Sequence, residues 1–525
     1  MKSTAKTVGL VMVIMLFSRF MAFIMTMVYT NFFGVESTEI NIYNYAITLP
    51  NTIFTILGTA ITIAVIPTFA GFLGTNEKER AFKFANNITS LSVIATIILS
   101  GIGMAISPLI ISLTKFKTDG YGFAVLALCI MFPVMIFYAL NYIFQGLLQS
   151  LGKFAAPAAV SIPSSLIVIL YVFIAGNKFG VTGLLIATFI GLAFQAIVLI
   201  PPLYKTEYRF KPSFNFRDED VKKALKLIPP VLIGTSAYQI NLFFNITVTA
   251  NFKNTVTIMY FVQYTVLYSI LALVYSLTAV IYPKLTMMAA RGEMDGFNTH
   301  LQKALKSVVF FLIPAAAGFI AVRYQLMSFL MGWGNKITPD NISLSSDILA
   351  LYAFSVLGIG IKEVMDRAFY SLKDTVRPAV NGVIIMAVNI GASLILIQVM
   401  GILGIPLAYS ISAITGAVII MLMMKKKVKT FNINSLIITI VKILTSSAVM
   451  FAAVICINHL LGGISLGGNI IEKGIKLFVP VAVGGTVYFV CTYILKVEEA
   501  YAMLNSVKRR LVKKPAQAGD KQEDI

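Results

Sequence analysis

Residues 8–30 read VGLVMVIMLFSRFMAFIMTMVYT, an apolar run with one charged side chain, Arg19. A membrane-spanning helix needs about 20 mostly apolar residues, so this run is long enough to cross a bilayer. Lys2 and Lys6 precede it, as in a signal peptide, but no short apolar core is followed by a small-residue cleavage pattern. The stretch therefore predicts a retained first transmembrane span.

The composition of the whole chain extends this pattern. Of the 525 residues, 58% are apolar and 12% are charged, whereas an average soluble domain has about 25% charged residues. None of the long apolar runs alternates with a period of two, which argues against a membrane β-barrel. The fourteen runs of spanning length lie at 8–30, 40–68, 85–112, 122–147, 156–176, 181–203, 225–250, 256–282, 304–322, 347–370, 378–399, 402–424, 435–459 and 474–495. We therefore predict an all-α polytopic membrane protein with about 14 transmembrane helices.

The basic residues give the predicted topology. The net charge is +20, from 42 Lys and Arg against 22 Asp and Glu. With the N-terminus on the cytoplasmic side, the inner segments hold 30 of the 42 basic residues and the outer segments hold 8. Cytoplasmic loops are rich in Lys and Arg, so this distribution predicts that both termini are cytoplasmic. Topology accounts for most of the charge, and we expect no nucleic-acid partner.

The chain also repeats itself at a fixed distance. The repeated residues, each 221 positions apart, are Ser150-Leu151 and Ser371-Leu372, Pro157 and Pro378, Gly180 and Gly401, and Gly183 and Gly404. An even number of spans per copy predicts two parallel six-helix repeats, and transporters built in this way usually bind substrate where the two lobes meet. The predicted divisions are an N-terminal lobe of spans 1–6 (1–210), a C-terminal lobe of spans 7–12 (211–430), two extra C-terminal helices (431–497) and a cytosolic tail (498–525).

The loops leave little room for an enzyme. The longest covers about 204–224, and the chain has no HExxH motif, phosphate-binding loop or nucleophile elbow. The acidic residues of the outer segments stand singly and form no catalytic pair. We therefore expect a transporter, with no catalytic residue, no metal site and no cofactor.

A few charged side chains fall inside predicted spans, where charge costs at least ~2.5–3.5 kcal/mol near the bilayer centre. Lys362 with Asp366, and Glu363 with Arg367, are spaced i,i+4 on one helix, so we predict two ion pairs and a candidate inner gate. Arg19 lies ~16 Å into its span, and that span contains no acid. Its guanidinium suits phosphate or carboxylate. We therefore predict that Arg19 faces a hydrated cavity and binds an anionic substrate.

Neutral polar side chains are the other candidates for lining such a cavity. Asn51, Gln239, Asn241 and Gln263 lie in predicted spans. Each is also of the type that makes a hydrogen bond between helices, which is the commoner role. Asn51 follows Pro50, which we expect to break its helix.

Two further sets of residues in the apolar runs have simple explanations. Lys442 lies near the inner end of its span, and its flexible stem lets the ammonium reach the headgroups. Cys129, Cys456 and Cys491 have no CxxC spacing, and we expect them to pack in the core.

Short motifs of the chain resemble those of a known family. In chain order they are Leu16-Phe17-Ser18-Arg19-Phe20, Asn31-Phe32-Phe33-Gly34, Leu49-Pro50-Asn51, Ile66-Pro67-Thr68-Phe69, Pro283-Lys284-Leu285, Arg367-Ala368-Phe369-Tyr370 and Gly401-Ile402-Leu403-Gly404. Their order and spacing resemble the MurJ/MviN family of lipid II flippases, part of the multidrug/oligosaccharidyl-lipid/polysaccharide exporter superfamily. Fourteen spans, with the last two extra, also fit that family.

The resemblance implies a flippase of the bacterial plasma membrane that moves an undecaprenyl-diphosphate-linked peptidoglycan precursor from the inner to the outer leaflet by alternating access. It implies that spans 13 and 14 form a groove for the lipid tail, and that Arg19 is one of the cationic residues that hold the diphosphate. The implied partners are the lipid-linked saccharide, with lipid II as the expected substrate, and membrane lipids, and we expect a monomer. Coupling to sodium or to the membrane potential is a further implication, and the coupling ion stays open.

The chain departs from the family at other cationic positions. An Arg-Asp pair usual in the family falls on Met25 and Thr26, an arginine of span 8 on Gln263, and an acidic residue near a sodium site on Asn245. Two alternatives therefore stay open: a flippase for another polyprenyl-linked saccharide, of the sporulation or polysaccharide-export type, and a multidrug or cation antiporter of the same fold. The antiporter would need a carboxylate in span 1 or span 7, where this sequence has none.

Overall fold

The computed structural model describes residues 2–215, 217–226, 228–333, 336–428, 430–431, 433–462, 470–501 and 503–505. Within these ranges every element of regular structure is a helix, and no strand occurs. The predicted all-α class is therefore confirmed. The predicted tail lies outside the described residues from position 506 onward.

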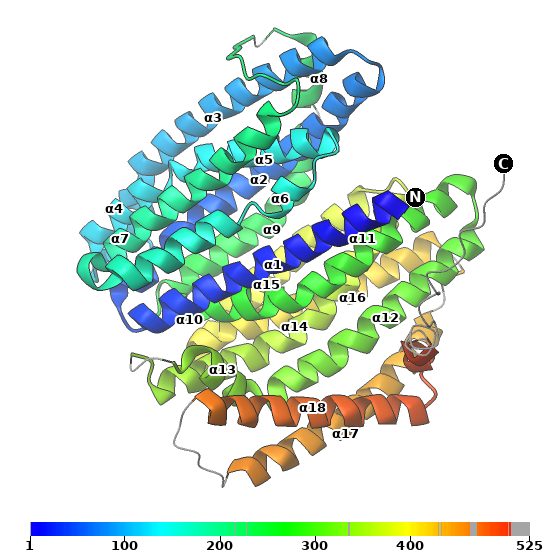
Figure 1. The fold of residues 1–525 in the computed structure, drawn as a ribbon. Coiled ribbons are helices and arrows are strands. Elements are labelled where there is room, and N and C mark those ends of the chain that lie inside the picture. Colours follow the sequence, from blue (N-terminus) through cyan, green and yellow to red (C-terminus); the bar gives the residue numbers. More distant parts are fainter. Residues whose placement is uncertain are drawn as a thin grey trace, which may run out of the picture. The chain divides into compact units, whose positions relative to one another are not determined.

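The helices are mostly long rods, as Figure 1 shows. In chain order they are α1 (Lys2–Phe33), α2 (Thr38–Gly74), α3 (Lys78–Ser112), η1 (Lys115–Lys117), α4 (Tyr121–Met131), α5 (Val134–Ser150), α6 (Ala155–Ala158), α7 (Ile162–Tyr204), α8 (Glu219–Lys226), α9 (Ile228–Thr249), α10 (Val256–Tyr260), the π-helical turn η2 (Phe261–Leu267), α11 (Tyr268–Arg291), α12 (Met294–Ala321), α13 (Arg323–Met331), α14 (Pro339–Ser371), α15 (Val376–Met400), η3 (Gly401–Leu403), α16 (Gly404–Lys427), α17 (Ile433–Gly462) and α18 (Ile470–Ile494).

Nine segments of the described residues are long and apolar enough to cross a membrane. Two of them, Ala155–Tyr204 and Val376–Lys427, have 50 and 52 residues, and each contains two of the predicted spans. A continuous helix of that length would extend ~75 Å, more than twice the hydrocarbon thickness. The predicted spans 40–68 and 256–282 fall on α2 and on α10 to α11, and residues 228–249 of the predicted span 225–250 form α9. In the described ranges each predicted span thus falls mostly on helix, while the count of fourteen stays a prediction.

Both long segments are broken at a glycine. Gly180 inside α7 has φ 56° and ψ −146°, and Gly401 at the end of α15 has φ 59° and ψ −134°. Only glycine adopts this region of backbone conformation readily. The break ends one spanning helix and begins the next within a few residues. The two glycines, which the sequence repeat pairs, therefore share both conformation and position between two spans.

Other residues with a positive φ angle also recur at a similar separation along the chain. Three further pairs have φ between 57° and 78°: Gly34 and Asn254, Asn76 and Gly292, and Gly152 and Lys373, at separations of 220, 216 and 221 residues. Positive φ is uncommon outside glycine, so the recurrence is a backbone counterpart of the repeated sequence. The lobe boundaries themselves stay a prediction.

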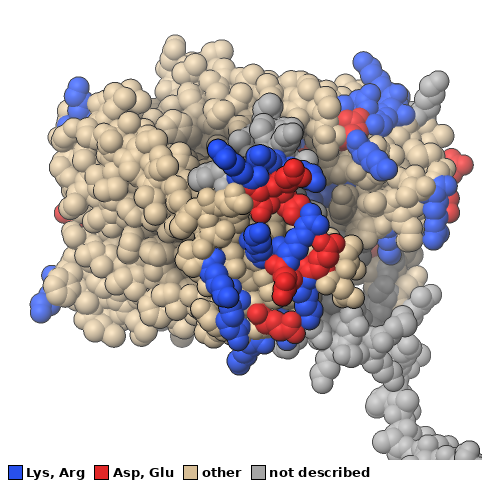
Figure 2. Space-filling view, turned by 90° about the horizontal axis from the view of Figure 1, so that it is seen from above, with Lys and Arg blue, Asp and Glu red and all other residues tan. Residues whose placement is uncertain are grey.

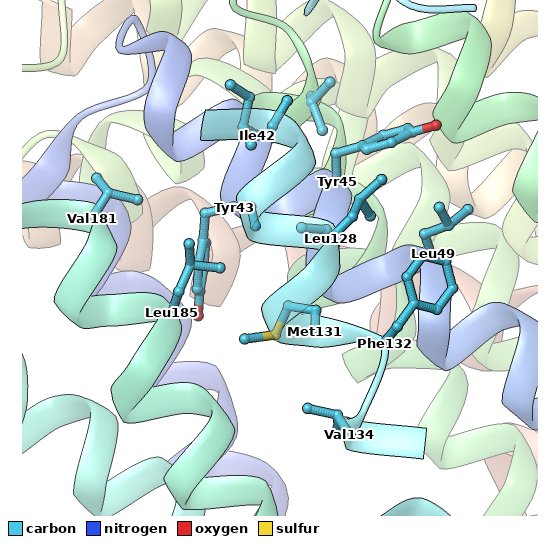
Figure 3. Packing of buried hydrophobic residues seen from close by; sticks show 14 of the residues in the cluster. Ile42, Tyr43, Tyr45, Leu49, Leu128, Met131, Phe132, Val134, Val181 and Leu185 are labelled. Carbon is cyan, nitrogen blue, oxygen red and sulfur yellow. The ribbon is translucent and has the colours of Figure 1, made fainter. Parts of the chain in front are cut away.

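The chain forms two compact units. The first contains Met1–Leu273, Met327–Ser355 and Asp374–Gly416, and the second contains Val274–Leu326, Val356–Lys373 and Ala417–Ile525. In the first unit, apolar residues of α2, α4, α5 and α7 share one core (Figure 3). Tyr43 of α2 lies in that core, and its hydroxyl bonds to the hydroxyl of Thr188 on α7 at 2.8 Å.

Buried amides hold α1 and α10 against α2 in the first unit. The Tyr29 hydroxyl donates to Asn44 Oδ1 at 2.9 Å, and Asn44 Nδ2 donates to the Thr257 hydroxyl at 3.1 Å. The backbone N–H of Thr257 donates to Asn41 Oδ1 at 2.9 Å. Polar groups buried among apolar helices need such partners. The network fixes the start of α10 and therefore positions η2, which follows it.

The second unit packs α12 along α17, and α17 along α18 (Figure 1). The Tyr488 hydroxyl donates to the Phe310 carbonyl at 2.6 Å, and Asn458 Nδ2 donates to the Ala321 carbonyl at 3.0 Å. The outward faces of α17 and α18 are apolar. Side chains there that are 56% to 67% exposed include Ile438, Val441, Phe478 and Ile494. Such faces suit contact with lipid.

The connection after α7 folds back onto the start of α3 in the first unit. Asn87 Nδ2 donates to the Asn215 carbonyl at 2.7 Å, and Asn87 Oδ1 accepts the Asn215 N–H at 2.9 Å. Arg80 donates to both carboxylate oxygens of Asp220, at 2.7 and 2.8 Å, and its guanidinium lowers the pKa of Asp220. Figure 2, seen from the α8 side of Figure 1, shows Lys and Arg gathered beside Asp and Glu. Acids therefore neutralise part of this basic region.

Two expectations about local structure are wrong. α2 continues through Pro50 without a break, because proline is tolerated in membrane helices whose surroundings satisfy the freed backbone groups. The three cysteines are free but not core residues: Cys456 is exposed, and Cys129 and Cys491 are half-buried. On a helix that faces lipid, an apolar sequence context does not imply burial in protein.

Candidate functional site

Arg19 lies on α1 with its side chain exposed, and its neighbours Phe17 and Phe20 are 51% and 58% exposed. The adjacent Ser18 is buried and donates a hydrogen bond to the Ala158 carbonyl at 2.7 Å. This bond and the packing of α1 on α6 and α7 fix one face of the helix. One position further along, and ~100° around the helix axis, Arg19 points away from that contact.

The Arg19 guanidinium has no hydrogen bond or ion pair with any residue in the described ranges. It lies within the candidate span Val13–Phe33. Charge in such a segment is costly, and residues of this kind usually face a cavity or a partner. Arg19 is therefore accessible and able to bind an anion.

Asn51 of α2 is the second exposed residue of the predicted site. Its Oδ1 accepts a long hydrogen bond from the Thr55 hydroxyl at 3.4 Å. Tyr29 and Asn44 join α1 to α2, as described above. Arg19 lies ~15 Å along α1 from Tyr29, and Asn51 lies ~10 Å along α2 from Asn44. The two exposed residues are thus at similar depths on consecutive helices.

Gln239 and Asn241 of α9 lie in the interior of the first unit, with exposed fractions of 8% and 1%. Asn241 Oδ1 has no hydrogen-bond partner among the described residues. These two amides therefore pack against neighbouring helices, and in this conformation they are less accessible than Arg19 and Asn51.

Gln263 lines a cavity of about 10 Å³ in the first unit, which is room for about one water. Asn245 and Thr249 of α9, Tyr260 of α10 and Tyr352 of α14 form its polar wall. The Tyr352 hydroxyl donates to Gln263 Oε1 at 3.5 Å. Gln263 Nε2 and both amide atoms of Asn245 have no partner among the described residues. Leaving buried amides unsatisfied costs free energy, so the cavity suits one small polar group.

The π-helical turn η2 brings Gln263 to this cavity. Such turns are rare and often occur at functional sites. The sequence alone singled out Gln263 and Asn245 but gave no sign that they share a cavity. It also missed Tyr352, whose only signal was one hydroxyl among the 22 tyrosines of the chain.

The four charges of α14 neutralise one another, and both predicted pairs are confirmed. Lys362 Nζ lies 2.5 Å from Asp366 Oδ2, and Arg367 Nη2 lies 2.9 Å from Glu363 Oε1. The Arg367 guanidinium also lies 5.8 Å from the ring centre of Tyr282. A gate at this cluster stays a prediction. The part of the chain that the structure describes contains no group of three His, Cys, Asp or Glu residues placed to hold a metal ion.

Comparison with known proteins decides between the families that this arrangement allows. A family model described as lipid II flippase MurJ matches residues 29–466 of the chain. The chain belongs to the MurJ family. The match begins ten residues after Arg19 and ends before α18, so it bears on neither. The family resemblance of the sequence motifs is thereby confirmed, and the protein is a multi-pass membrane protein of the bacterial inner membrane.

Curated MurJ relatives are similar along most of their length. A probable lipid II flippase MurJ of Bdellovibrio bacteriovorus is 23% identical over 464 residues, which cover 86% of this chain and 88% of the relative. A lipid II flippase MurJ of Thermosipho africanus is 28% identical over 437 residues, which cover 82% of this chain and 88% of the relative.

Solved structures show the same fold. A lipid II flippase MurJ in an inward closed conformation superimposes with a TM-score of 0.77 at 23% identity, over 93% of this chain and 98% of that one. An inward-facing multidrug resistance transporter of the MATE family gives a TM-score of 0.65 at 16% identity, over 79% and 98%. The MurJ fold and the MATE fold are thus variants of one architecture, and the fold alone does not choose the substrate.

Proposed function

We propose that this MurJ-family protein moves lipid II, an undecaprenyl-diphosphate-linked peptidoglycan precursor, from the inner to the outer leaflet by alternating access. The observation that carries the proposal is Arg19, an exposed guanidinium without a partner among the described residues, on an apolar helix of a MurJ-family chain. The diphosphate is an anionic group of this substrate, and a guanidinium binds phosphate oxygens through paired N–H donors.

The physical problem explains why such a protein is needed. A large polar head has to cross ~30 Å of hydrocarbon. A hydrated path between two lobes lowers that barrier while the polyprenyl tail stays in lipid, and a shift between two conformations exposes the path to one side at a time. The exposed apolar faces of α17 and α18 suit the tail.

The other predicted site residues differ in how directly we propose that they contact the substrate. Asn51, exposed at a depth similar to that of Arg19, is the next substrate contact. Gln239, Asn241 and Gln263 are buried in this conformation, so they reach substrate only when helices of the first unit separate during the transport cycle. The paired charges of α14 stabilise that helix beside the candidate inner gate, and transport does not require the charges themselves.

The proposal also includes the topology and the composition of the working unit. Because the inner segments hold most of the basic residues, both termini face the cytoplasm. The working unit is one chain without a resident cofactor, and it is a transporter and not an enzyme. The driving ion stays open between sodium and the membrane potential.

The likeness to MATE transporters favours a cation-coupled antiporter as the second candidate. Such a protein would need an ionised carboxylate in the membrane that exchanges one cation for another. In α14, Glu363 and Asp366 are each bonded to a cation of the same helix. Because these carboxylates are already engaged, the flippase is the better-supported function.

The test is transport by the full-length protein reconstituted in liposomes. Three labelled cargoes are compared: lipid II, an undecaprenyl-diphosphate-linked saccharide without peptide, and a cationic dye driven by a sodium or proton gradient. We expect lipid II to become accessible to an external probe faster than in protein-free liposomes, with Arg19→Gln slow and Lys178→Gln, an exposed lysine of α7, unchanged. Faster transport of the peptide-free saccharide than of lipid II, or of the dye alone, would contradict the proposal.

A further inference from the structure

The second unit contains a cavity of about 310 Å³. Its wall is formed by α12, α17 and the residues that follow α18, and includes three lysines: Lys306, Lys442 and Lys496. By the same measure, this cavity is about thirty times as large as the one-water cavity of the first unit. It is therefore large enough for a small headgroup.

The lysines of the cavity are only partly neutralised. Lys306 Nζ lies 3.4 Å from Glu498 Oε2, and the Glu498 side chain is 77% exposed, so this pair is loose. Lys442 and Lys496 have no ion-pair partner in the described ranges. Glu499 also lines the cavity with a buried Oε2 that has no hydrogen-bond partner there, and burial raises the pKa of Glu499. The wall therefore carries excess positive charge.

The backbone brings Lys496 to the cavity through an unusual turn. Lys496 follows α18 with φ 52°, and the Val497 N–H donates to the Thr492 carbonyl at 3.0 Å. Helix ends of this kind usually place glycine at the left-handed position. A lysine at that position is conformationally disfavoured, and here it supplies an ammonium group to the cavity wall.

An apolar surface adjoins the same cavity. Ile438 lines the cavity and is 60% exposed, and Val441 and Leu444, three and six residues further along α17, are 56% and 50% exposed. A cationic pocket beside an exposed apolar helix face matches the two ends of an anionic lipid, its phosphate and its acyl chains.

We propose that this cavity binds the phosphate headgroup of an anionic phospholipid, with Lys306, Lys442 and Lys496 around the phosphate and the acyl chains along α17. The bound lipid joins α12, α17 and the end of α18. The three lysines are not among the residues assigned to the transported substrate, whereas the acyl chains share the apolar face of α17 with the polyprenyl tail proposed above. The headgroup site therefore stands or falls on the lysines, independently of the flippase assignment. By the predicted topology, the lipid belongs to the cytoplasmic leaflet.

The first test measures the thermal unfolding midpoint of the purified full-length protein in detergent with added phosphatidylglycerol, phosphatidylcholine or inorganic phosphate. We expect the midpoint to rise with phosphatidylglycerol concentration and to change little with the other two. Equal protection by phosphatidylcholine would show that the cavity does not recognise the negative charge of the lipid. Equal protection by inorganic phosphate would assign the cavity to a free anion. Either result overturns the proposal.

Substitutions in the cavity wall test whether the three lysines bind phosphatidylglycerol. Lys496→Gly removes an ammonium and relieves the left-handed strain, so the lipid-free protein should be at least as stable as the parent. Its apparent Kd for phosphatidylglycerol should rise about fivefold, and the triple variant Lys306→Gln/Lys442→Gln/Lys496→Gly should weaken binding about 100-fold. Glu498→Gln removes an opposing carboxylate and should tighten binding.

The matched control is Lys425→Gln/Lys426→Gln/Lys427→Gln, which removes the same charge from the last turn of α16. We expect it to change the Kd by less than about twofold, because none of these three lysines lines the cavity. An unchanged Kd in Lys496→Gly and in the triple variant would overturn the proposal, and so would an equal loss in the control.

Discussion

Helices α1 and α14 both place charged side chains in apolar spans, but only the charges of α14 are paired within their own helix. On α14, Lys362 pairs with Asp366 and Arg367 pairs with Glu363, each across one helical turn. On α1, Arg19 has no acid on its own helix and stays exposed. Charges four residues apart satisfy each other within the helix, whereas a single charge has to find its counter-charge elsewhere. We therefore propose a ligand role for the single charge and a structural role for the pairs.

The largest effect is expected at Arg19. Arg19→Gln should slow lipid II flipping by about 10- to 100-fold, because it removes charge-assisted hydrogen bonds to the diphosphate. Arg19→Lys keeps the charge but loses the two-pronged donor geometry, so it should fall between the parent and the glutamine variant. The rate of lipid II exposure in reconstituted liposomes measures this order. A rate for Arg19→Lys below that of Arg19→Gln would contradict a role in binding anions.

The next effect is on stability, at the paired charges. Asp366→Asn leaves the Lys362 ammonium without its counter-charge and should lower the free energy of unfolding by about 3 kcal/mol. The double variant Lys362→Met/Asp366→Leu removes both charges and should restore most of the loss. Thermal unfolding in detergent checks both. A double variant as unstable as Asp366→Asn would show that the stability of α14 depends on more than charge neutrality.

A smaller effect is expected at Asn51. Asn51→Ala should slow flipping about fivefold, the size of one neutral hydrogen bond, without changing the unfolding midpoint, because the side chain is exposed. Flipping rate and thermal midpoint are measured on the same preparation. A drop in midpoint with unchanged flipping would reverse the assignment and make Asn51 structural.

The smallest effect is expected at the surface pair of Arg80 and Asp220. The guanidinium lowers the pKa of the Asp220 carboxyl, so the ionised carboxylate stabilises the fold above its ordinary pKa. That contribution is lost as the pH falls through the lowered pKa. Asp220→Asn should therefore lower the unfolding midpoint slightly at neutral pH, less so in acid, and leave flipping unchanged. A pH-independent difference would show that the pair acts through packing and not through charge.

Local spacing made part of this structure predictable. Apolar run length located the helices, and i,i+4 spacing gave the two ion pairs of α14. Gly180 and Gly401, which the sequence repeat pairs, lie where the two long segments break between spans, because glycine is needed wherever the chain turns through that conformation.

Features that depend on packing between distant segments were not predictable. The cavity that joins Gln263, Asn245 and Tyr352 needs a π-helical turn and three separate parts of the chain. The lysine-lined cavity of the second unit needs a lysine in a left-handed turn, for which the sequence gives no signal. The burial of the cysteines was predicted wrongly because apolar spans face lipid as well as protein.

The most direct test of the account compares the single charge with a charge pair in one assay. Arg19→Gln and Lys362→Met/Asp366→Leu are reconstituted at equal protein density, and the rate at which labelled lipid II becomes accessible on the outside is recorded. We expect the Arg19 variant to lose most of the rate and the double variant to keep it. Full activity of Arg19→Gln, or loss of activity only in the folded double variant, would contradict this expectation.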